Sequence, residues 1–387
     1  MKTWYKITVL GIFVLALACT GGKKKTNTSA TKVTGLKWSK ERAWEWYNAL
    51  PWLVGTNFNP SSSINQLEFW QADTFDPETI DRELKWSADL GMNLHRVYLH
   101  NLLWEQDSLG FLKRLDNYLR IADSHGIQTM FVLLDDVWHP IPKLGKQPEP
   151  IPHVHNSGWV QAPGATILGD TLRHNGLEGY IKGVVRAFAK DHRVLVWDVY
   201  NEPDNVAMQP GRAAMEVRNK HDFSLALLRK VMRWCREVDP DQPLTSGIWR
   251  GNLRNWGKLD SLPDVDRYML ENSDIISFHA YDGSMEDIRQ KITELQTYGR
   301  PLLCTEYLAR GTGNTFEQVM PIFKKDKVAA INWGLVSGKS NTIYPWISWD
   351  STFTGEPHVW HHDVLRPDGT PFSPEEVAFI KEMTRNP

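Results

Sequence analysis

Trp197-Asp198-Val199-Tyr200-Asn201-Glu202-Pro203 carries the strongest structural signal in the chain. The residues that lead into it, 194–197, are β-branched, aliphatic or aromatic, which is typical of a buried strand. Pro203 has no backbone N–H with which to extend a strand ladder, so we expect the chain to leave the sheet at Glu202. The stretch therefore predicts a buried strand whose end presents a carboxylate.

A second stretch of the same kind is Pro301-Leu302-Leu303-Cys304-Thr305-Glu306-Tyr307, which also ends an apolar strand in a glutamate. Two carboxylates at strand ends would suffice to cleave a glycosidic bond, because one can protonate the leaving oxygen while the other attacks the anomeric carbon or activates water. Each glutamate alone could instead cap the helix that follows it or pair with an arginine. The chemistry is therefore indicated by the pair, Glu202 and Glu306, rather than by either residue.

Strand-like and helix-like segments alternate along the chain. We expect strands at 52–58, 93–99, 128–134, 194–202, 244–249, 275–281, 301–306 and 328–333. We expect helices at 77–91, 111–125, 176–190, 221–238, 264–270, 284–297 and 315–324. This alternation favours a single-domain α/β fold, a closed (β/α)8 TIM barrel, over an open sheet. No Gly-x-Gly-x-x-Gly turn follows the first strand, which argues against a dinucleotide-binding fold.

The carboxyl ends of all strands of such a barrel meet at one site, and three polar residues near these ends fit it. Arg96 lies among apolar neighbours in the second predicted strand, so it needs a carboxylate partner, and we expect it to orient Glu306. His279 and Tyr281 are two residues apart, so both point to one face of the sixth strand. A phenol there could stabilise the charge of a nearby carboxylate. Each of the three could instead be an ordinary buried residue.

Two further residues at strand ends could contact a sugar directly. Trp333 ends the eighth predicted strand and could form an apolar floor beneath the ring, although it could equally fill the barrel. Asn201 could hydrogen-bond the 2-hydroxyl of the sugar. Alternate residues of a strand face opposite sides, so Asn201 and Glu202 can both face the site only if the strand twists or bulges between them.

The composition limits the possible ligands. The chain carries 44 basic and 46 acidic residues, a net charge of −2, so no overall field would attract nucleic acid or an anionic membrane. The 18 tryptophans suit a neutral carbohydrate partner, because indole faces stack on sugar rings. We expect no cofactor and no metal. Five histidines could suggest a metal site, but they lack the compact spacing of metal ligands. They are His153, His155, His174, His361 and His362.

The N-terminus has the features of an export signal. The apolar run 7–18 is too short to cross a bilayer but has the length of a signal-peptide core. Leu15-Ala16-Leu17-Ala18-Cys19 resembles the lipobox of bacterial lipoproteins, although Ala16 stands where leucine is usual; plain secretion is the alternative. We therefore expect an exported bacterial envelope protein that is held to a membrane only by a lipid on Cys19. In this division the signal peptide covers 1–19, a flexible tether covers 20–37 and the barrel covers 38–387.

Taken together, these residues resemble the clan A retaining glycoside hydrolases, particularly the cellulase-like enzymes of glycoside hydrolase family 5, over residues 52–346. The resemblance implies that Glu202 is the general acid/base and Glu306 the nucleophile. It implies that the substrate is held by Arg96, Asn201, His279, Tyr281 and Trp333. After the third strand, where family members often have a histidine, this chain has Asp135-Asp136-Val137-Trp138, and we expect Asp136 and Trp138 to contact the sugar.

The resemblance implies hydrolysis of a β-linked polysaccharide or oligosaccharide through a covalent glycosyl-enzyme intermediate. An alternative from another class is a glycan-binding surface lipoprotein that keeps the barrel but has lost catalysis. The presence of both Glu202 and Glu306 weighs against that alternative. A transglycosylase shares the covalent intermediate, so the sequence leaves it open.

Overall fold

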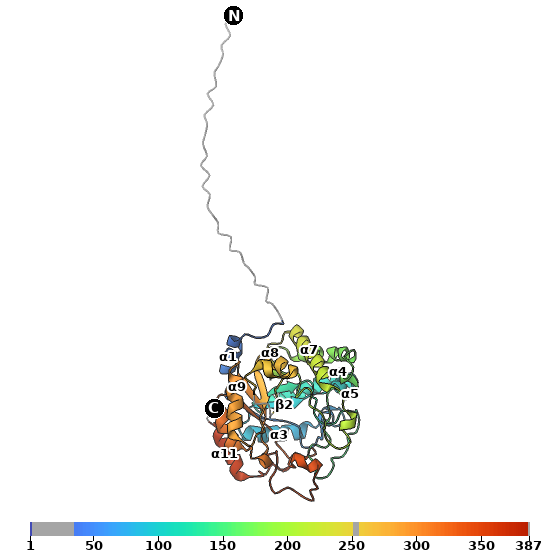
Figure 1. The fold of residues 1–387 in the computed structure, drawn as a ribbon, viewed down its shortest axis with the longest axis vertical. Helices are drawn as coiled ribbons and strands as arrows, with labels where there is room; N and C mark the ends of the chain where they lie inside the picture. Colours follow the sequence, from blue (N-terminus) through green and yellow to red (C-terminus); the bar gives the residue numbers. More distant parts are fainter. Residues whose placement is uncertain (2–34, 251–254, 386–387) are drawn as a thin grey trace. The chain divides into compact units, whose positions relative to one another are not determined.

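The computed structural model describes Met1, residues 35–250 and residues 255–385 (Figure 1). The rest of the predicted signal segment, its candidate lipidation site Cys19 and the tether as far as residue 34 lie outside the described residues. The residues from 35 onward form one compact unit. Among the described residues, no helix has the length and apolar character needed to span a membrane.

Eight parallel strands form the centre of the described structure, in the order β5-β4-β3-β2-β1-β8-β7-β6. The ends of this order meet through a bridge between Ile248 and Phe278, so the sheet is a nearly closed barrel. This confirms the predicted (β/α)8 fold. The strands are β1 Val54–Asn57, β2 Leu94–Tyr98, β3 Gln128–Val132, β4 Val194–Asp198, β5 Leu244–Thr245, β6 Ile276–His279, β7 Leu302–Glu306 and β8 Ala329–Trp333.

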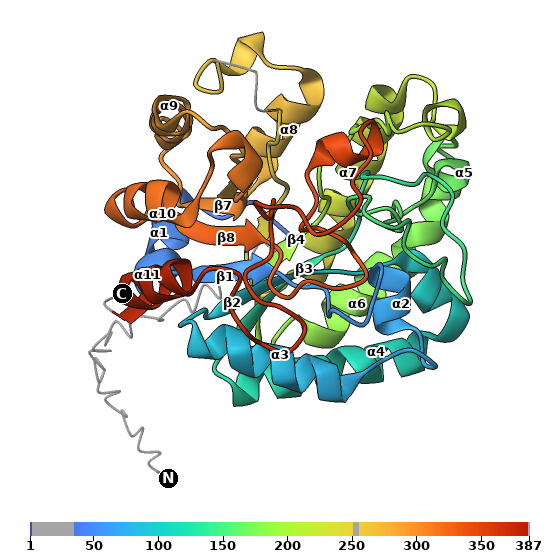
Figure 2. The ribbon, with the colours of Figure 1, turned by 90° about the horizontal axis from the view of Figure 1, so that it is seen from below.

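Helices follow the strands and form the outer ring, as Figure 2 shows. The main ones are α3 Pro77–Asp89, α4 Asn101–Ser124, α6 Glu178–Phe188, α7 Lys220–Val238, α8 Asp264–Asn272, α9 Met285–Gln296, α10 Phe316–Lys325 and α11 Pro374–Arg385. Shorter ones are α1 Lys40–Asn48, α2 Gln66–Trp70, α5 Ala165–Leu168, η1 Arg173–Leu177, η2 Ala213–Met215, η3 Leu259–Ser261, η4 Arg310–Thr312 and η5 Trp346–Trp349.

Helix α3 shows how local sequence sets these boundaries. The Asp76 side chain accepts a hydrogen bond from the Thr79 backbone N–H at 3.0 Å, and Pro77 occupies the first helical position, where no donor is needed. Gly91 follows the helix with φ of +79°, a left-handed conformation that glycine adopts without steric cost. The helix predicted from these three residues is confirmed.

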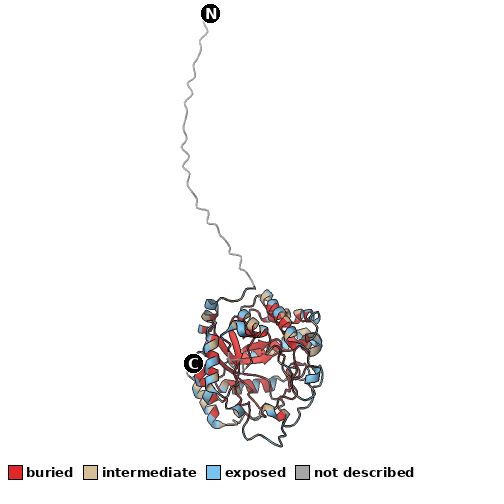
Figure 3. Cartoon of the chain, in the orientation of Figure 1, coloured by how far each residue is buried: buried red, intermediate tan, exposed pale blue. Residues whose placement is uncertain are grey.

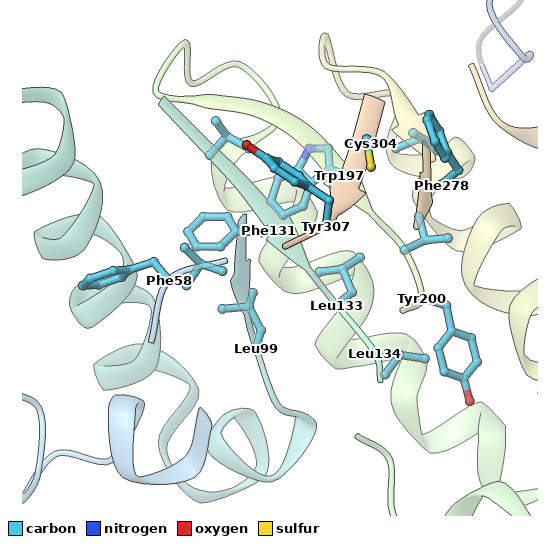
Figure 4. Packing of buried hydrophobic residues seen from close by; sticks show 14 of the residues in the cluster. Phe58, Leu99, Phe131, Leu133, Leu134, Trp197, Tyr200, Phe278, Cys304 and Tyr307 are labelled. Atoms are coloured by element: carbon cyan, nitrogen blue, oxygen red, sulfur yellow. The ribbon is translucent and has the colours of Figure 1, made fainter. Parts of the chain in front are cut away.

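Apolar side chains fill two layers, because successive strand residues point to opposite sides of the sheet. Met130 and Leu303 belong to the inner cluster, inside the barrel. Their neighbours Phe131 and Cys304 belong to the larger cluster between strands and helices (Figure 4). In Figure 3 the strands are buried, while the helices around them expose their outer faces. This two-layer core holds the strand ends in fixed positions.

Helix α1, which the sequence did not predict, packs against the end of the barrel where the strands begin. Its residues Ala43 and Tyr47 join the inner apolar cluster. The Tyr47 hydroxyl donates to the Lys327 carbonyl at 3.0 Å, and Trp44 Nε1 donates to the Gly299 carbonyl at 3.1 Å, both just before strands. Helix α1 therefore closes the amino end of the barrel.

The fifth strand is shorter than predicted. The ladder of β5 ends at Thr245, not at 249. Beyond it, Ser246 Oγ donates to the Tyr200 carbonyl at 2.7 Å, and only Ile248 pairs again with β6. The apolar pattern of 244–249 predicts burial, and burial alone does not show where the strand ends. At Ser246 a side-chain hydrogen bond takes the place of the backbone hydrogen bonds of the ladder.

Candidate active site

The segment after β4 brings two neighbouring side chains to the same site. The ladder of β4 ends at Asp198, and Asn201 makes only an isolated bridge with Asp135. Glu202 then adopts φ of +41°, in the left-handed region. This break in the extended backbone removes the alternation that would put Asn201 and Glu202 on opposite faces. Both residues line the same cavity.

This cavity lies at the carboxyl ends of the strands and has a volume of about 230 Å³. Residues that follow six strands, from β3 to β8, contribute side chains to it. They are Asp135, Val137, Trp138, His155, Asn156, Trp159, Asn201, Glu202, Asn205, Trp249, Tyr281, Glu306, Trp333, Trp346 and His362. Eight of its fifteen lining residues are tryptophan, tyrosine or histidine, so the cavity offers flat faces next to carboxylates.

Glu306, at the end of β7, is almost completely buried and is held at both oxygens. Its Oε1 accepts from Arg96 Nη1 at 2.8 Å and from the Tyr98 hydroxyl at 2.9 Å. Its Oε2 accepts from the Tyr281 hydroxyl at 2.8 Å. Burial, together with the charge of Glu306, raises the pKa of Tyr281 well above its usual value, so this phenol remains a donor.

Arg96 is completely buried and links several groups of the site. Its Nε and Nη2 donate to Asp198 Oδ2 at 3.0 and 2.7 Å, and Nη2 also donates to Asn201 Oδ1 at 2.6 Å. Its Nη1 donates to Glu306 and to Asn57 Oδ1, each at 2.8 Å. The planar fork of the guanidinium thus fixes Asn201 and Glu306 relative to each other.

Glu202 has a different environment from Glu306. Its Oε1 lies 2.7 Å from His279 Nδ1, and its Oε2 accepts from Asn205 Nδ2 at 2.5 Å. The same His279 nitrogen lies 3.5 Å from Glu306 Oε2. One carboxylate oxygen of Glu202 and one of Glu306 lie within 4.8 Å of each other. The imidazole of His279 therefore stands between two closely spaced carboxylates.

Asp135 supports Asn201 from the side opposite Arg96. It accepts from Asn201 Nδ2 at 2.9 Å, from Trp159 Nε1 at 2.7 Å and from the Val137 backbone N–H at 3.0 Å. Complete burial raises the pKa of Asp135 to about 8, although these donors favour the charged form. The Asn201 amide is held at both of its ends, so its orientation in the cavity is fixed.

The structure corrects the placement of Asp136. This residue is completely buried and does not line the cavity. Its carboxylate accepts from the Tyr200 hydroxyl at 2.6 Å, from Ser224 Oγ at 2.5 Å and from the Asp204 backbone N–H at 2.7 Å. Asp136 is therefore wrong as a sugar contact, because adjacent residues point to opposite sides and its neighbour Asp135 faces the cavity.

Aromatic rings form two groups around the cavity. Trp333, at the end of β8, contacts Tyr98 and Trp159 edge to face, with ring centroids 5.8 Å apart in both pairs. Trp138 has φ of +72° and stacks on Trp349 with centroids 6.0 Å apart. Trp333 and Trp138 both line the cavity, as expected from the sequence.

The histidines of the sequence do not form one cluster. His174 bonds to the Leu168 carbonyl, away from the cavity, whereas His155, His361 and His362 lie together. Among the described residues, the group with ligand atoms spaced for a metal ion is a different one, Glu202, His279 and Glu306. Arg96 already places a cation against Glu306, so the charge that a metal would supply there is provided by the chain.

Several cavity and supporting residues were not predicted from the sequence. Tyr98 could have been found, because it lies two residues after Arg96 on the same strand face. Asp198 could have been found as a buried acid four residues before Glu202. Trp249, by contrast, lies on a loop, and Trp346 begins the single-turn helix η5; the course of the chain at both places is not encoded in a strand or helix period.

Comparison with known proteins identifies the family. Residues 55–350 match the family model described as Cellulase (glycosyl hydrolase family 5). The chain belongs to glycoside hydrolase family 5. The resemblance inferred from the sequence is thus confirmed, and a family 5 member is a glycoside hydrolase, an enzyme acting on carbohydrate. A search of curated proteins finds no significant match.

Solved structures share the barrel of this family 5 protein at low sequence identity. A family 5, subfamily 18 protein of Streptomyces cattleya, solved with GlcNAc, has a TM-score of 0.57 at 14% identity, covering 86% of this chain and 80% of its own. The β-1,4-mannanase of the sea hare Aplysia kurodai has a TM-score of 0.52 at 16% identity, and the match covers 73% of this chain and 87% of the mannanase. The endo-β-1,4-mannanase of Thermotoga petrophila has a TM-score of 0.53 at 12% identity, and the match covers 88% of this chain and 77% of the mannanase. These similarities support the fold alone.

The buried contacts of Arg96 predict a large effect on stability. Arg96→Met should lower the free energy of unfolding by about 3–5 kcal/mol, because it leaves the completely buried Asp198 without its partner. We expect a fall in Tm of about 4–7 °C, measured by calorimetry. The matched control is Arg366→Met, whose partner Glu356 has a side chain that is 48% exposed; this change should cost at most about 1 kcal/mol. Equal Tm values for both variants would contradict this assignment.

Proposed function

We propose that the protein is a retaining β-glycosidase in which Glu306 is the nucleophile and Glu202 the general acid/base. The observation that carries the proposal is the approach of their carboxylate oxygens to within 4.8 Å. Retaining enzymes place the two carboxyl groups about 5–5.5 Å apart, whereas inverting enzymes need about 6.5–9.5 Å to admit a water molecule. The spacing supports direct attack by a carboxylate.

The contacts of the two glutamates suit these different roles. Arg96, Tyr98 and Tyr281 all donate to Glu306, which favours the anion that a nucleophile requires. Glu202 accepts from the neutral amide of Asn205 and lies beside His279, which leaves it able to carry or release a proton.

The reaction then proceeds in two steps that balance. Glu306 attacks the anomeric carbon while Glu202 gives its proton to the departing oxygen, so the glycosidic bond breaks and a glycosyl ester of Glu306 forms. Water next attacks the same carbon, Glu202 takes a proton from that water, and the ester bond to Glu306 breaks. Asn201, fixed by Arg96 and Asp135, is positioned to bond the 2-hydroxyl during both steps. Trp333 supplies the floor for the ring.

The stereochemistry of the product tests this proposal. Incubation with aryl β-glucosides, β-mannosides and β-xylosides, followed by proton NMR, should show the β-anomer first for the sugar that is cleaved. An α-anomer appearing first would contradict the retaining assignment. Binding of β-linked oligosaccharides without any cleavage would instead favour the glycan-binding alternative. Products longer than the substrate would indicate transglycosylation.

We also propose that the enzyme is exported and lipid-anchored through Cys19, which lies outside the described residues. The support is the apolar run 7–18 and the lipobox-like stretch that ends at Cys19. In a bacterial expression host, metabolic labelling with a fatty acid should mark the wild-type protein and not Cys19→Ala. Labelling of the variant would contradict the assignment.

A further inference from the structure

Two loop segments are joined by hydrogen bonds into one wall, defined here as residues 151–157 and 340–349. The first segment belongs to the loop after β3 and the second to the region after β8, which runs across the barrel in Figure 2. Bonds between them run from Asn156 N to Ser340 O (2.8 Å), His155 N to Ser348 Oγ (2.9 Å), Trp349 Nε1 to His155 O (2.9 Å) and Asn341 Nδ2 to Ile151 O (3.1 Å).

The contacts of its two ends show which sides of the site the wall closes. Asn156 and Ser340 line a second, smaller cavity at the ends of β1 and β2, which lie between β3 and β8 in the sheet. Asn57 and Tyr98 line this cavity from the strand ends. It shares Trp159 and Trp333 with the main cavity.

The other end of the wall contacts residues that follow β6 and β4. Trp346 contacts Tyr281, which follows β6, with ring centroids 5.2 Å apart, and the Arg212 guanidinium, which follows β4, lies 4.4 Å from the Trp349 ring. The wall therefore bounds the active site on the side of β1 and β2 through Asn156, and on the side of β6 through Trp346.

Glu202 follows β4 and is held by His279 and Asn205. As general acid it must face the departing oxygen, so the leaving group lies over β4 and β5, where Asn205 and Trp249 line the cavity. The sugar that becomes attached to Glu306 then lies between Trp333 and the wall. The main cavity, at about 230 Å³, is below the range of about 300–1,000 Å³ typical of sites for larger organic ligands.

The wall presents an unsatisfied polar side chain to this sugar. Asn156 is 1% exposed and borders both cavities. Within the described part of the chain, neither Nδ2 nor Oδ1 of Asn156 has a hydrogen-bond partner. Buried amides in native proteins are nearly always paired, so the missing partner points to a ligand. One donor and one acceptor on the same amide match two neighbouring hydroxyls of a sugar.

Two histidines of the main cavity offer further acceptors: His155, next to Asn156 in the chain, and His362, whose ring centroid lies 5.3 Å from that of His155. His155 Nδ1 lies 2.8 Å from the Tyr344 carbonyl, and His362 Nδ1 bonds to the Leu308 carbonyl. Because a carbonyl only accepts, both Nδ1 atoms donate, and each Nε2 is left as an acceptor. Both rings line the main cavity, so the sugar meets acceptors suited to its hydroxyl groups.

We propose that the wall makes the active site a blind pocket for one sugar ring, so that the enzyme removes single sugars from the non-reducing end, with Asn156 binding the hydroxyls of that sugar. This rests on the proposed function. The anomeric carbon of the bound sugar faces Glu202 and Glu306, so its remaining hydroxyls face the wall. A further sugar attached to one of these hydroxyls would collide with residues 151–157 or 340–349.

The order of product release tests the proposal. The probes are pentasaccharides of β-1,4-linked glucose, mannose and xylose, each carrying a fluorescent label at the reducing end. For the sugar that is cleaved, labelled tetra-, tri- and disaccharide should appear in that order, with monosaccharide as the unlabelled product. Early labelled disaccharide together with unlabelled trisaccharide would overturn the blind pocket and leave the glycosidase assignment standing. Failure to cleave any probe or aryl β-glycoside would overturn both.

A substitution at Asn156 tests the part assigned to its side chain. Asn156 has φ of +47°, a conformation that glycine adopts freely, so Asn156→Gly removes the amide without straining the backbone. We expect KM for the cleaved oligosaccharide to rise about tenfold, as for the loss of one or two hydrogen bonds. The matched control is Asn219→Gly, an exposed asparagine with φ of +54° at the start of α7, which should leave KM unchanged. A wild-type KM for Asn156→Gly would overturn this role.

Discussion

Glu306→Gln should reduce turnover of a β-glycoside by a factor on the order of 10⁴ or more while the barrel remains folded. The amide keeps the shape of the carboxylate but is a far weaker nucleophile, so no glycosyl ester can form. With the carbonyl oxygen in the place of Oε1, Arg96 and Tyr98 can still donate to it, and the new amide N–H can donate to the Tyr281 hydroxyl. Arg96 also keeps its contact with Asp198. The measurement is kcat on the preferred aryl glycoside, together with Tm from calorimetry.

Two controls make the Glu306 result specific. Glu317→Gln, on the exposed side of α10, repeats the same chemical change far from the cavity and should keep wild-type turnover. A 2-deoxy-2-fluoro glycoside with a good leaving group should form a stable ester, and peptide mass analysis should find it on Glu306 in the wild type. Substantial turnover by Glu306→Gln, or an ester on another residue, would refute the nucleophile assignment.

Glu202→Ala should lower kcat/KM by about 10²–10⁴ on substrates with a sugar leaving group, because no acid then protonates the departing oxygen. On a dinitrophenyl glycoside, whose leaving group departs without protonation, the first step should be nearly unaffected. Azide should restore turnover and give a β-glycosyl azide, since it needs no general base. Alanine and glutamate both carry a Cβ, so φ of +41° at this position costs the variant no more than the wild type.

The leaving-group dependence distinguishes catalysis by Glu202 from a structural role. A misfolded site would lose activity on all substrates in proportion, and azide would not restore it. Equal losses on the sugar and dinitrophenyl leaving groups would therefore contradict the acid/base assignment. His279 and Asn205, which contact Glu202, would then become the residues to examine.

The sequence predicted the elements whose signal is local. Strands β4 and β7 are recognised because each is an apolar run that ends in a polar residue, and α3 because Asp76, Pro77 and Gly91 mark both ends. The packing of α1 against the amino end of the barrel could not be predicted in this way. Its role depends on contacts with Gly299 and Lys327, which are distant in the chain.

In the candidate site, too, the residues with a local sequence signal were predicted and those that depend on tertiary contacts were not. Arg96, Asn201, His279, Tyr281 and Trp333 were predicted because each lies at or near the end of a strand. The choice of Asp136 over Asp135 was wrong, because the direction of a side chain just after a strand depends on the backbone there. The wall could not be foreseen, because its two segments meet only through the tertiary structure.

Closure of the barrel by α1 bears on how the enzyme can be handled. Trp38 N donates to Asp274 Oδ1 at 2.7 Å, so the chain joins the barrel beside the starts of its strands. The candidate active-site cavity lies at the other rim. A resin or a fluorescent label coupled at position 36, where Leu36 is exposed, would therefore attach on the rear of the enzyme and leave the opposite rim unobstructed.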